Sequence, residues 1–528
     1  MAINYKDLAN NTNPSWRHDP GMRRGMLHIV LLYFTVYSLG YDGSLLNGLQ
    51  ALPAWQRDLE YPTGTKLGLI AASYYLPKIP LAPVFSILTD KYGRRFTIAI
   101  GVFFMLAGAI VAGFSYSVAQ FIGARVLLGV GTVAAQIGTV TLIPELAHPR
   151  MRHFAGSFLL TTFYIGSILS AWITFAMVYF PGESAWAWRI PALFQGVGPV
   201  VLGFGLWFVP ESPRWLITKG RDAEAHQILA TYHANGKMDD ELVVFEMSEI
   251  KAQIEVSKVS KETSWMTFVN VASNRRRIGV IILIGLCTQL SGNGVVQYYL
   301  VPILKTVGIT APPQTAGING GLAIMNWFVA MGGASLVERY GRRPLFLISL
   351  AGQLFCFVML TGLAGGYDTT KIPAMGVSIV PFIFIQQAFY SAALTPLPLL
   401  YVPEILPTAL RAKGVGLYGM SQNVAQTFNQ FANPVALAAI GWRYYAVYVG
   451  VLIAFLVGFY FTIRETRGLT VEEAAVIFED DDKKLEMMEA ERRINEAAAL
   501  RLASEQNELK KTNSKSESME HDEYKNDV

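Results

Sequence analysis

The chain has 528 residues, of which 52% are hydrophobic and only 16% are charged, and its mean hydropathy is +0.34. Soluble proteins carry about 25% charged residues, so this composition excludes an ordinary soluble domain and indicates a polytopic membrane protein. The formal net charge of +4 is small and gives no reason to expect nucleic-acid binding; the positions of the basic residues matter because they orient membrane spans.

Apolar runs of roughly 20 residues, each long enough to cross a hydrocarbon core of about 30 Å, recur from about Gly25 to Ile463. About twelve such spans are predicted, in two groups of six. They lie near residues 27–50, 66–88, 96–115, 120–143, 154–178, 189–209, 278–305, 316–337, 344–364, 374–400, 412–434 and 442–463. The predicted fold is therefore an all-α membrane protein with two six-helix bundles.

Hydrophilic stretches divide this array of spans. Residues 1–26 are polar, show no cleavable signal pattern and are predicted to be a cytosolic N-terminal segment. The first bundle is predicted at 27–209 and the second at 278–463. The stretch between them, 210–277, is rich in Glu, Lys and Asp and is predicted to form cytosolic linker helices. The charged tail at 464–528 is predicted to be cytosolic, with a solvated helix and a disordered end.

Basic residues gather in the loops on one side of the predicted spans. By the positive-inside rule these loops, and with them both termini, are predicted to be cytosolic, and the expected location is the plasma membrane. The basic loop residues are Lys91, Arg94, Arg95, Arg150, Arg152, Arg339, Arg342, Arg343, Arg411 and Lys413.

The two halves of the chain repeat their charged loops. The sequence Asp90–Arg95 recurs, barely changed, as Glu338–Arg343. Glu145 stands seven residues before Arg152, and Glu404 stands seven residues before Arg411. Duplicated halves with charged hinges are typical of alternating-access transporters, and they favour rocking halves over the fixed pore of a channel.

The sequence lacks the motifs of disulfide-rich proteins, metal sites and ATP-driven pumps. Cys287 and Cys356 both fall inside apolar spans, and they give neither a disulfide framework nor metal-ligand spacing. No phosphate-binding loop of the Gly-x4-Gly-Lys-Ser/Thr type occurs, which argues against an ATP-driven pump. The sequence therefore predicts no enzyme activity, no cofactor and no metal site. It leaves the oligomeric state open.

With these motifs in this order, the chain resembles the sugar porters of the major facilitator superfamily. The resemblance covers roughly residues 30–470 and implies a transporter whose partners are a small-molecule sugar, a proton and the lipid bilayer. The motifs that carry it are Gly40–Gly43, Asp90–Arg95, Gly123–Arg125, Glu145 with Arg152, Pro210–Trp215, Gln289 with Tyr298 and Tyr299, Glu338–Arg343, Glu404 with Arg411, and Glu465–Gly468.

The resemblance assigns a gating role to the repeated charges. Such charges at cytosolic helix ends can form ion pairs between helices that hold the two bundles together when the inside is closed, and opening inward would break them. The alternative is that they only anchor the topology. The residues with the implied gating role are Asp90, Arg94, Glu145, Arg152, Glu338, Arg342, Glu404 and Arg411.

Asp42 lies in the middle of the first apolar span, where an ionised carboxylate costs roughly 2.5–3.5 kcal/mol and needs a partner or a proton. Arg125, the other intramembrane charge singled out in this half, is the expected partner. In proton-driven sugar porters the matching pair couples transport, so the hypothesis is symport with Asp42 as the proton site and Arg125 as its tuner. A static structural pair, in a facilitative uniporter, is the alternative.

The substrate site is expected at the midplane between the halves, because that is where transporters built from repeats bind. Amide side chains suit sugar hydroxyls, and aromatic rings suit the apolar face of a pyranose. Each of these groups could instead be a bond between helices. The candidates are Gln289, Asn293, Tyr298, Tyr299, Asn326 and Gln422.

The chain departs from the hexose-type pattern at several of these positions. Leu160, Ser167, Thr288, Gly294 and Leu399 stand where that pattern has larger or more polar groups. The Ser-Gly-Asn variant of the seventh span resembles the fungal lactose- and cellodextrin-permease branch, which implies import of a disaccharide or short oligosaccharide. Hexose or pentose transport, and a non-transporting sugar sensor, remain the alternatives.

Overall fold

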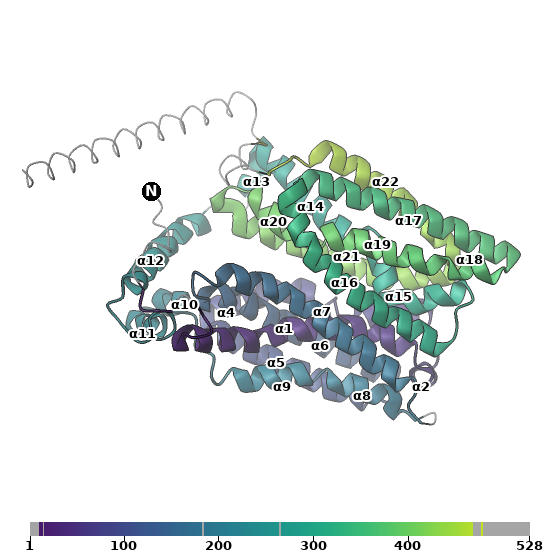
Figure 1. Cartoon of the computed structure of the whole chain (residues 1–528), viewed down its shortest axis with the longest axis horizontal. Coiled ribbons are helices and arrows are strands. Elements are labelled where there is room, and N and C mark those ends of the chain that lie inside the picture. Colours follow the sequence, from purple (N-terminus) through teal and green to yellow (C-terminus); the bar gives the residue numbers. More distant parts are fainter. Residues whose placement is uncertain (1–9, 14, 182–183, 263–265, 468–476, 479–528) are drawn as a thin grey trace, which may run out of the picture.

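The computed structural model describes residues 10–13, 15–181, 184–262, 266–467 and 477–478, and within these ranges the secondary structure is helical, without a strand. Figure 1 shows two helical bundles lying side by side, with a group of shorter helices at one end. The all-α prediction with two bundles is therefore confirmed. The predicted helix in the tail, and most of the tail itself, lie outside the described residues.

The first bundle contains six membrane-length segments, of which the second and the sixth are each broken into two helices. A short helix, α2 (Pro53–Asp58), follows the first segment. The segments are α1 (Pro20–Gln50), α3 (Gly64–Ala72) with α4 (Lys78–Tyr92), α5 (Arg94–Gly113), α6 (Val118–Leu146), α7 (Arg152–Met177), and α8 (Trp186–Phe194) with α9 (Val197–Gly205).

The second bundle repeats this arrangement, with breaks in its first and fourth segments. Its helices are α14 (Ala272–Leu290) with α15 (Asn293–Thr306), α16 (Pro312–Tyr340), α17 (Arg342–Thr370), α18 (Pro373–Val377) with α19 (Ile379–Ala393) and α20 (Leu397–Glu404), α21 (Thr408–Ile440) and α22 (Tyr444–Thr462). The linker helices are α10 (Pro213–Thr218), α11 (Asp222–His233), α12 (Glu241–Glu262) and α13 (Met266–Asn270).

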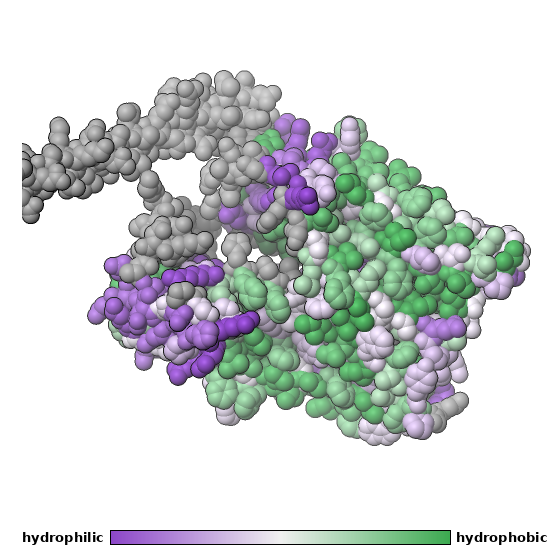
Figure 2. Space-filling model, in the orientation of Figure 1, coloured by the Kyte–Doolittle hydropathy of each residue, from purple (hydrophilic) through white to green (hydrophobic). Residues whose placement is uncertain are grey.

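The surface of the bundles suits a bilayer. Eight stretches of the described residues are long and apolar enough to cross a membrane, and one of them, Lys413–Thr462, contains both α21 and α22. Large apolar side chains face outward on these helices, among them Phe103, Phe428 and Phe461. Figure 2 shows hydrophobic residues spread over both bundles and hydrophilic residues over the linker helices. The chain is an integral membrane protein.

The first helix begins earlier than the sequence predicts. α1 starts at Pro20 rather than near residue 27, because Asp19 Oδ1 accepts a hydrogen bond from the backbone N–H of Met22 at 2.8 Å and caps the helix. Proline at the first helical position has no N–H to leave unsatisfied. The basic residues between these two starting points therefore belong to the helix.

Small residues let α1 and α7 approach closely inside the first bundle. A Cβ atom at Gly40 would lie 1.9 Å from the backbone oxygen of Phe163, and one at Gly166 would lie 2.0 Å from that of Tyr37. Neither glycine can therefore carry a side chain without moving a backbone. Close backbone contact of this kind is how helices pack where lipid removes the hydrophobic driving force.

The linker helices are bonded to the first bundle through a buried pair. His233, at the end of α11, lies with Nδ1 2.5 Å from Glu246 Oε2 on α12, and its Nε2 lies 3.3 Å from the backbone oxygen of Leu146 on α6. Arg152 approaches the same carboxylate at 3.7 Å. His148 stacks edge-on against His233, with ring centroids 5.1 Å apart. Linker and bundle therefore share one polar cluster.

The surroundings of the two histidines shift their pKa values in opposite directions. Burial alone would lower the pKa of His233, but the Glu246 carboxylate and its hydrogen bond raise that pKa above its ordinary value. Burial, followed by the charge of His233, lowers the pKa of His148 to about 3. The cluster therefore favours a proton on His233 over one on His148.

Replacing Glu246 with Gln should loosen the linker in a pH-dependent way. Because the folded pKa of His233 is raised, the stabilisation from the pair is fully present below the unfolded pKa of about 6.5 and is lost as the pH rises through the folded value. Breaking one partner of a buried pair costs up to about 3 kcal/mol. Tryptic cleavage at Lys237 and Lys251 should accelerate in Glu246→Gln relative to the unmodified chain, more at pH 6 than at pH 9.

The exposed Asp239, on the same linker, supplies the control. Asp239→Asn should leave the cleavage rates unchanged at every pH. A ratio of rates for Glu246→Gln that stays constant with pH would contradict the assignment of the proton to His233.

Candidate functional site

The two bundles touch near the end of the molecule that carries α2, as Figure 1 shows. Asn47 Nδ2, on α1, donates to Asn319 Oδ1, on α16, at 2.8 Å. Gln50 Nε2 donates to the backbone oxygen of Tyr298, on α15, at 2.9 Å. All these side chains are nearly or fully buried. Two buried amides therefore join the halves at this end.

Close helix packing at the same end reinforces these bonds. α3 packs on α21, where a Cβ at Gly68 would lie 2.9 Å from the backbone oxygen of Phe431. α7 packs on α16, where Gly320 lies against the ring of Trp172. If the basic loops are cytosolic, this is the extracellular side, and the molecule is closed to the outside.

Asp42 and Arg125 lie together inside the first bundle, with exposed fractions of 1% and 3%. They do not form the direct ion pair that the sequence predicts. Arg125 Nη1 donates to the backbone oxygen of Asp42 at 3.3 Å, and within the described structure neither carboxylate oxygen of Asp42 has a hydrogen-bond partner. The guanidinium lies instead over the ring of Tyr74, with Cζ 4.7 Å from the centroid, which holds it by a cation–π contact.

Four of the six predicted sugar ligands lie on the broken segment formed by α14 and α15. Gln289 lies in the last turn of α14 and is buried, and its backbone oxygen accepts a hydrogen bond from Asn429 Nδ2 at 2.7 Å. Asn293 Nδ2 donates to Gln297, while Asn293 Oδ1 is buried and has no hydrogen-bond partner among the described residues. These amides therefore retain polar atoms for further bonds.

The tyrosines of this segment differ from one another. The Tyr298 hydroxyl accepts a hydrogen bond from Gln426 Nε2 at 3.1 Å, and the Tyr298 ring lies 6.2 Å from that of Tyr75 in the first bundle. Tyr299 is fully buried, and its hydroxyl donates to the backbone oxygen of Gln430 at 2.6 Å, inside the second bundle. Tyr298 thus faces the other half, whereas Tyr299 holds a kink in its own half.

The two remaining predicted ligands stand on separate helices. Asn326, on α16, accepts a hydrogen bond from Ser391 on α19 at 3.1 Å. Gln422, on α21, is half-buried. The structure therefore does not gather all six residues into one cluster. Gln426, one turn beyond Gln422, has the contact with Tyr298, and a sequence pattern cannot distinguish two amides on neighbouring turns.

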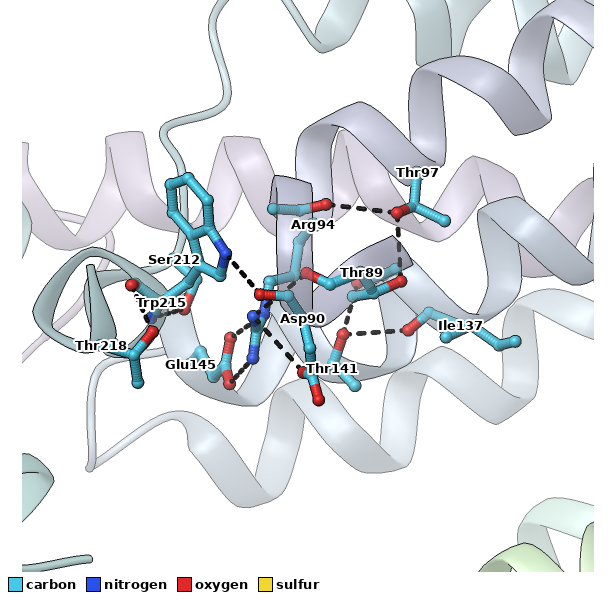
Figure 3. Close-up of polar contacts among 12 residues, drawn as sticks. Thr89, Asp90, Arg94, Thr97, Ile137, Thr141, Glu145, Ser212, Trp215 and Thr218 are labelled. Atoms are coloured by element: carbon cyan, nitrogen blue, oxygen red, sulfur yellow. Dashed lines mark hydrogen bonds and ion pairs between the residues drawn. The ribbon is translucent and has the colours of Figure 1, made fainter. Parts of the chain in front are cut away.

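The repeated charges form matching ion pairs at the other end of the bundles. Arg94 binds Glu145 through two hydrogen bonds of 3.0 and 3.1 Å, and Figure 3 shows this pair beside Asp90, whose carboxylate lies 4.0 Å from Arg94. Arg342 binds Glu404 in the same way, at 3.2 and 2.6 Å. Each of these pairs lies within one bundle.

The predicted bonds between the bundles belong to an arrangement that is closed at this end; the pairs described here lie within one bundle, and the gating role stays a prediction. The bundles are joined at the opposite end, and at this end each glutamate pairs with the arginine of its own half. Arg152 approaches Glu246 of the linker, and Arg411 has two buried nitrogens without a hydrogen-bond partner in the part of the chain that the structure describes. The side chain of Glu338 lies outside the described residues.

A second acid completes each arginine cluster. Glu211 accepts hydrogen bonds from the backbone N–H groups of Arg94 and Arg95, both at 3.1 Å. Glu465 accepts from those of Arg342 and Arg343, both at 2.9 Å. The carboxylates thus cap the N-termini of α5 and α17, where the helix dipole favours negative charge. We did not predict this role, although the acid follows the sixth span in both halves and the repeat carries that signal.

Other contacts could not be predicted from the sequence, because they depend on where each side chain lies in the folded bundles. Asn47, Gln50 and Asn319 are amides in otherwise ordinary spans, and nothing in their spacing marks them as partners. No group of three potential metal ligands occurs among the residues that the structure describes.

Comparison with known proteins identifies the family. The model of the family described as "Sugar (and other) transporter" matches residues 29–478, so the chain belongs to this family. Among its relatives, the MFS glucose transporter mfs1 of Aspergillus flavus is 25% identical, over 87% of this chain and 91% of that protein. The hexose transporter HXT13 of Saccharomyces cerevisiae is 23% identical, over 87% and 85%.

Solved structures share the fold. The xylose transporter XylE from E. coli, in an inward open conformation, superposes with a TM-score of 0.71 at 19% identity, covering 86% of this chain and 100% of that chain. The same protein, described as a proton:xylose symporter and bound to a bromodeoxyglucose, gives a TM-score of 0.67 at 20% identity, over 87% and 99%. At these identities the likeness establishes the major facilitator fold.

The buried and exposed Arg–Glu pairs of this chain should differ in strength. Arg94 and Glu145 are 10% and 14% exposed, whereas Arg221 and Glu224 on the linker are 50% and 53% exposed and also form two hydrogen bonds. Glu145→Gln should cost about 2 kcal/mol and lower the apparent Tm in detergent by several degrees, because it removes the nearer acid from a largely enclosed guanidinium and leaves only Asp90 at 4.0 Å. Glu224→Gln should change stability by less than about 0.5 kcal/mol. Equal melting temperatures for the two variants would contradict this ranking.

Proposed function

We propose that this member of the family imports a disaccharide or short oligosaccharide together with a proton, across the plasma membrane, by alternating access. The observation that carries the proposal is the carboxyl group of Asp42, which is buried in a membrane span without a hydrogen-bond partner in the described structure. An ionised carboxylate in such a place is costly, and a proton removes the charge. The names of the relatives support a sugar as the substrate.

The coupling that we propose follows from the contacts of Arg125. Its guanidinium is held between the backbone oxygen of Asp42 and the ring of Tyr74, rather than on the carboxylate. A small movement of α1 against α6 would bring the guanidinium to the carboxylate and favour the charged form. Proton release and bundle movement are thereby linked.

For gating, we propose that the two Arg–Glu pairs keep the cytosolic end of each bundle rigid, so that the halves move as units. Two buried nitrogens of Arg411 have no hydrogen-bond partner among the residues that the structure describes, and in this scheme they bond to the opposite half when the cytosolic side closes. In this scheme the bonds that break first on opening to the outside are those of Asn47 and Gln50. Both termini lie in the cytosol in the same scheme, with the linker helices.

Removing the proton site should separate transport from coupling. In Asp42→Asn, sugar-induced alkalinisation of the medium should disappear while counterflow exchange of labelled sugar in proteoliposomes persists, because exchange requires no net proton movement. Asp368→Asn, which alters an exposed acid in the last turn of α17, is the matched control and should keep both activities. An undiminished proton signal in Asp42→Asn would exclude Asp42 as the proton site and favour the uniport alternative.

The proposed preference for more than one sugar ring rests on small groups in the spans. Ser167, where hexose porters have a larger amide, is bonded to Ser44 at 2.6 Å. Gly294 lies against Asn429, where a Cβ would come within 2.2 Å of the amide nitrogen. Thr288 is buried and bonds to its own helix. The side chain of Leu160 lies outside the described residues. None of the three positions 167, 288 and 294 carries the amide that hexose porters use to bind a single ring, and this loss is the ground for the proposed preference.

Monosaccharide transport is the second candidate, because the relatives are named for glucose and hexose. A competition panel separates the two. Uptake of labelled cellobiose or lactose should be inhibited by the other disaccharide more strongly than by glucose or xylose, and a protonophore should abolish accumulation. Strong glucose uptake without disaccharide uptake would overturn the disaccharide proposal. Binding without flux in liposomes would identify a sensor instead.

A further inference from the structure

A lysine occupies the break in the second membrane segment. α3 ends at Ala72 and α4 begins at Lys78, and the five residues between them form turns. Lys78 is only 4% exposed, at the level of the Asp42 site. Neither the family motifs nor the proposed mechanism uses this residue. A lysine inside a membrane span is costly and is by default a sign of function.

The Lys78 ammonium is held by aromatic rings. Its Nζ atom lies 3.9 Å from the ring centroid of Tyr74 and 4.9 Å from that of Tyr75, which are cation–π distances. Tyr74 also carries the guanidinium of Arg125. No side-chain hydrogen bond or ion pair to Lys78 occurs among the described residues. The rings therefore hold the charge without neutralising it.

The charges around Lys78 do not balance. The charged groups that interact electrostatically with Lys78 are the carboxylate of Asp42 and the guanidinium of Arg125. Asp42 in turn interacts with both Arg125 and Lys78. One acid faces two bases, so the site keeps one positive charge in excess when all three are ionised. A buried charge without a counter-charge is unstable in a low-dielectric interior. A bound anion would bring the sum to zero.

The backbone at the break does not supply this anion site. The N–H of Lys78 donates to the oxygen of Tyr75 at 3.1 Å, the N–H of Leu81 donates to that of Pro77 at 3.2 Å, and Pro80 has no N–H. The start of α4 thus has few free donors. An anion here would be held by the charge of the lysine side chain, which extends back toward the break.

Lys78 is also connected to the sugar site that we propose. The ring of Tyr75 contacts Lys78 on one side and lies 6.2 Å from the ring of Tyr298 in the second bundle. On α4, Lys78, Ala82 and Ser86 share one face at four-residue spacing, and they are buried, half-buried and exposed in that order. The ammonium of Lys78 is thus close to the interface between the two bundles. It also lies on the face of α4 that becomes exposed toward the proposed cytosolic end.

We propose that Lys78 is a specificity-determining residue that binds a carboxylate on the transported sugar, so that the preferred substrates are acidic sugars such as uronates and uronate-containing disaccharides. This inference rests on the proposed function, since it assumes that the Asp42 region is part of the translocation site. Lys78 selects the charge of the substrate, and the amides and Tyr298 of the second bundle bind its hydroxyls and ring.

The test compares sugars that differ only in a C6 carboxylate or hydroxymethyl group: glucuronate with glucose, and cellobiouronate with cellobiose. Binding is measured by thermal stabilisation of the purified full-length protein, and uptake is measured in proteoliposomes. The unmodified chain should bind each acid about tenfold tighter than its neutral counterpart. Lys78→Met should lose this preference and keep its affinity for the neutral sugar, while Lys78→Arg should retain the preference. Lys66→Met, which removes an exposed lysine from the outer end of the same segment, should behave as the unmodified chain.

The outcomes separate this inference from the proposed function. Transport of neutral sugars without any response to the acids would overturn the role of Lys78 and leave sugar import standing. Equal losses for acid and neutral sugars in both Lys78→Met and Lys78→Arg would also overturn it, because they indicate a structural residue. Transport of the acids alone, lost in Lys78→Met, would sustain the inference and exclude a neutral disaccharide as the substrate.

Discussion

The paired Arg–Glu clusters at the ends of the two bundles are the constraint on which the rest of the molecule depends. Each cluster ties the start of one helix to the end of another and to the chain that leaves the bundle: Arg94 binds Glu145, and Glu211 caps the helix that Arg94 begins. The second half repeats this with Arg342, Glu404 and Glu465. Because every bond lies within one half, each half is a rigid unit, and movement is confined to the surface between them.

That surface is held by few and weak bonds, in contrast to the clusters. Two amide contacts and close packing of glycines join the bundles at one end. Neutral amide bonds in membrane interiors contribute about 0.6 kcal/mol each on average, which is small against a charged pair with two hydrogen bonds. The molecule thus combines strong bonds inside each half with weak bonds between halves, and this difference allows two arrangements of the same rigid units to be close in energy.

The two bundles and the equivalent positions of the repeated charges were predictable, because apolar runs recur along the sequence and the charged loops are duplicated. Runs of membrane length predict the bundles, and the recurrence of Asp90–Arg95 as Glu338–Arg343 predicts equivalent positions in two halves. The partners of these charges were not predictable. Whether Arg94 binds Glu145 of its own half or an acid of the other half depends on how the bundles are tilted, and the sequence is the same in both arrangements. Asp42 and Arg125 illustrate the same limit: their proximity followed from two charges in apolar spans, but the ring of Tyr74 decides where the guanidinium lies.

Tyr74 and its neighbours lie at the break in the second segment. Tyr74 and Tyr75 stand four and three residues before Lys78, and both rings lie against its ammonium. Gly129 of α6 permits this, because a Cβ there would lie 2.2 Å from the backbone oxygen of Tyr74. The ammonium of Lys78 is thus held beside Asp42 and Arg125 by the two aromatic rings, in a space that Gly129 and the break leave for them. The prolines of this segment predict the break from the sequence. They do not predict that Lys78 is buried there.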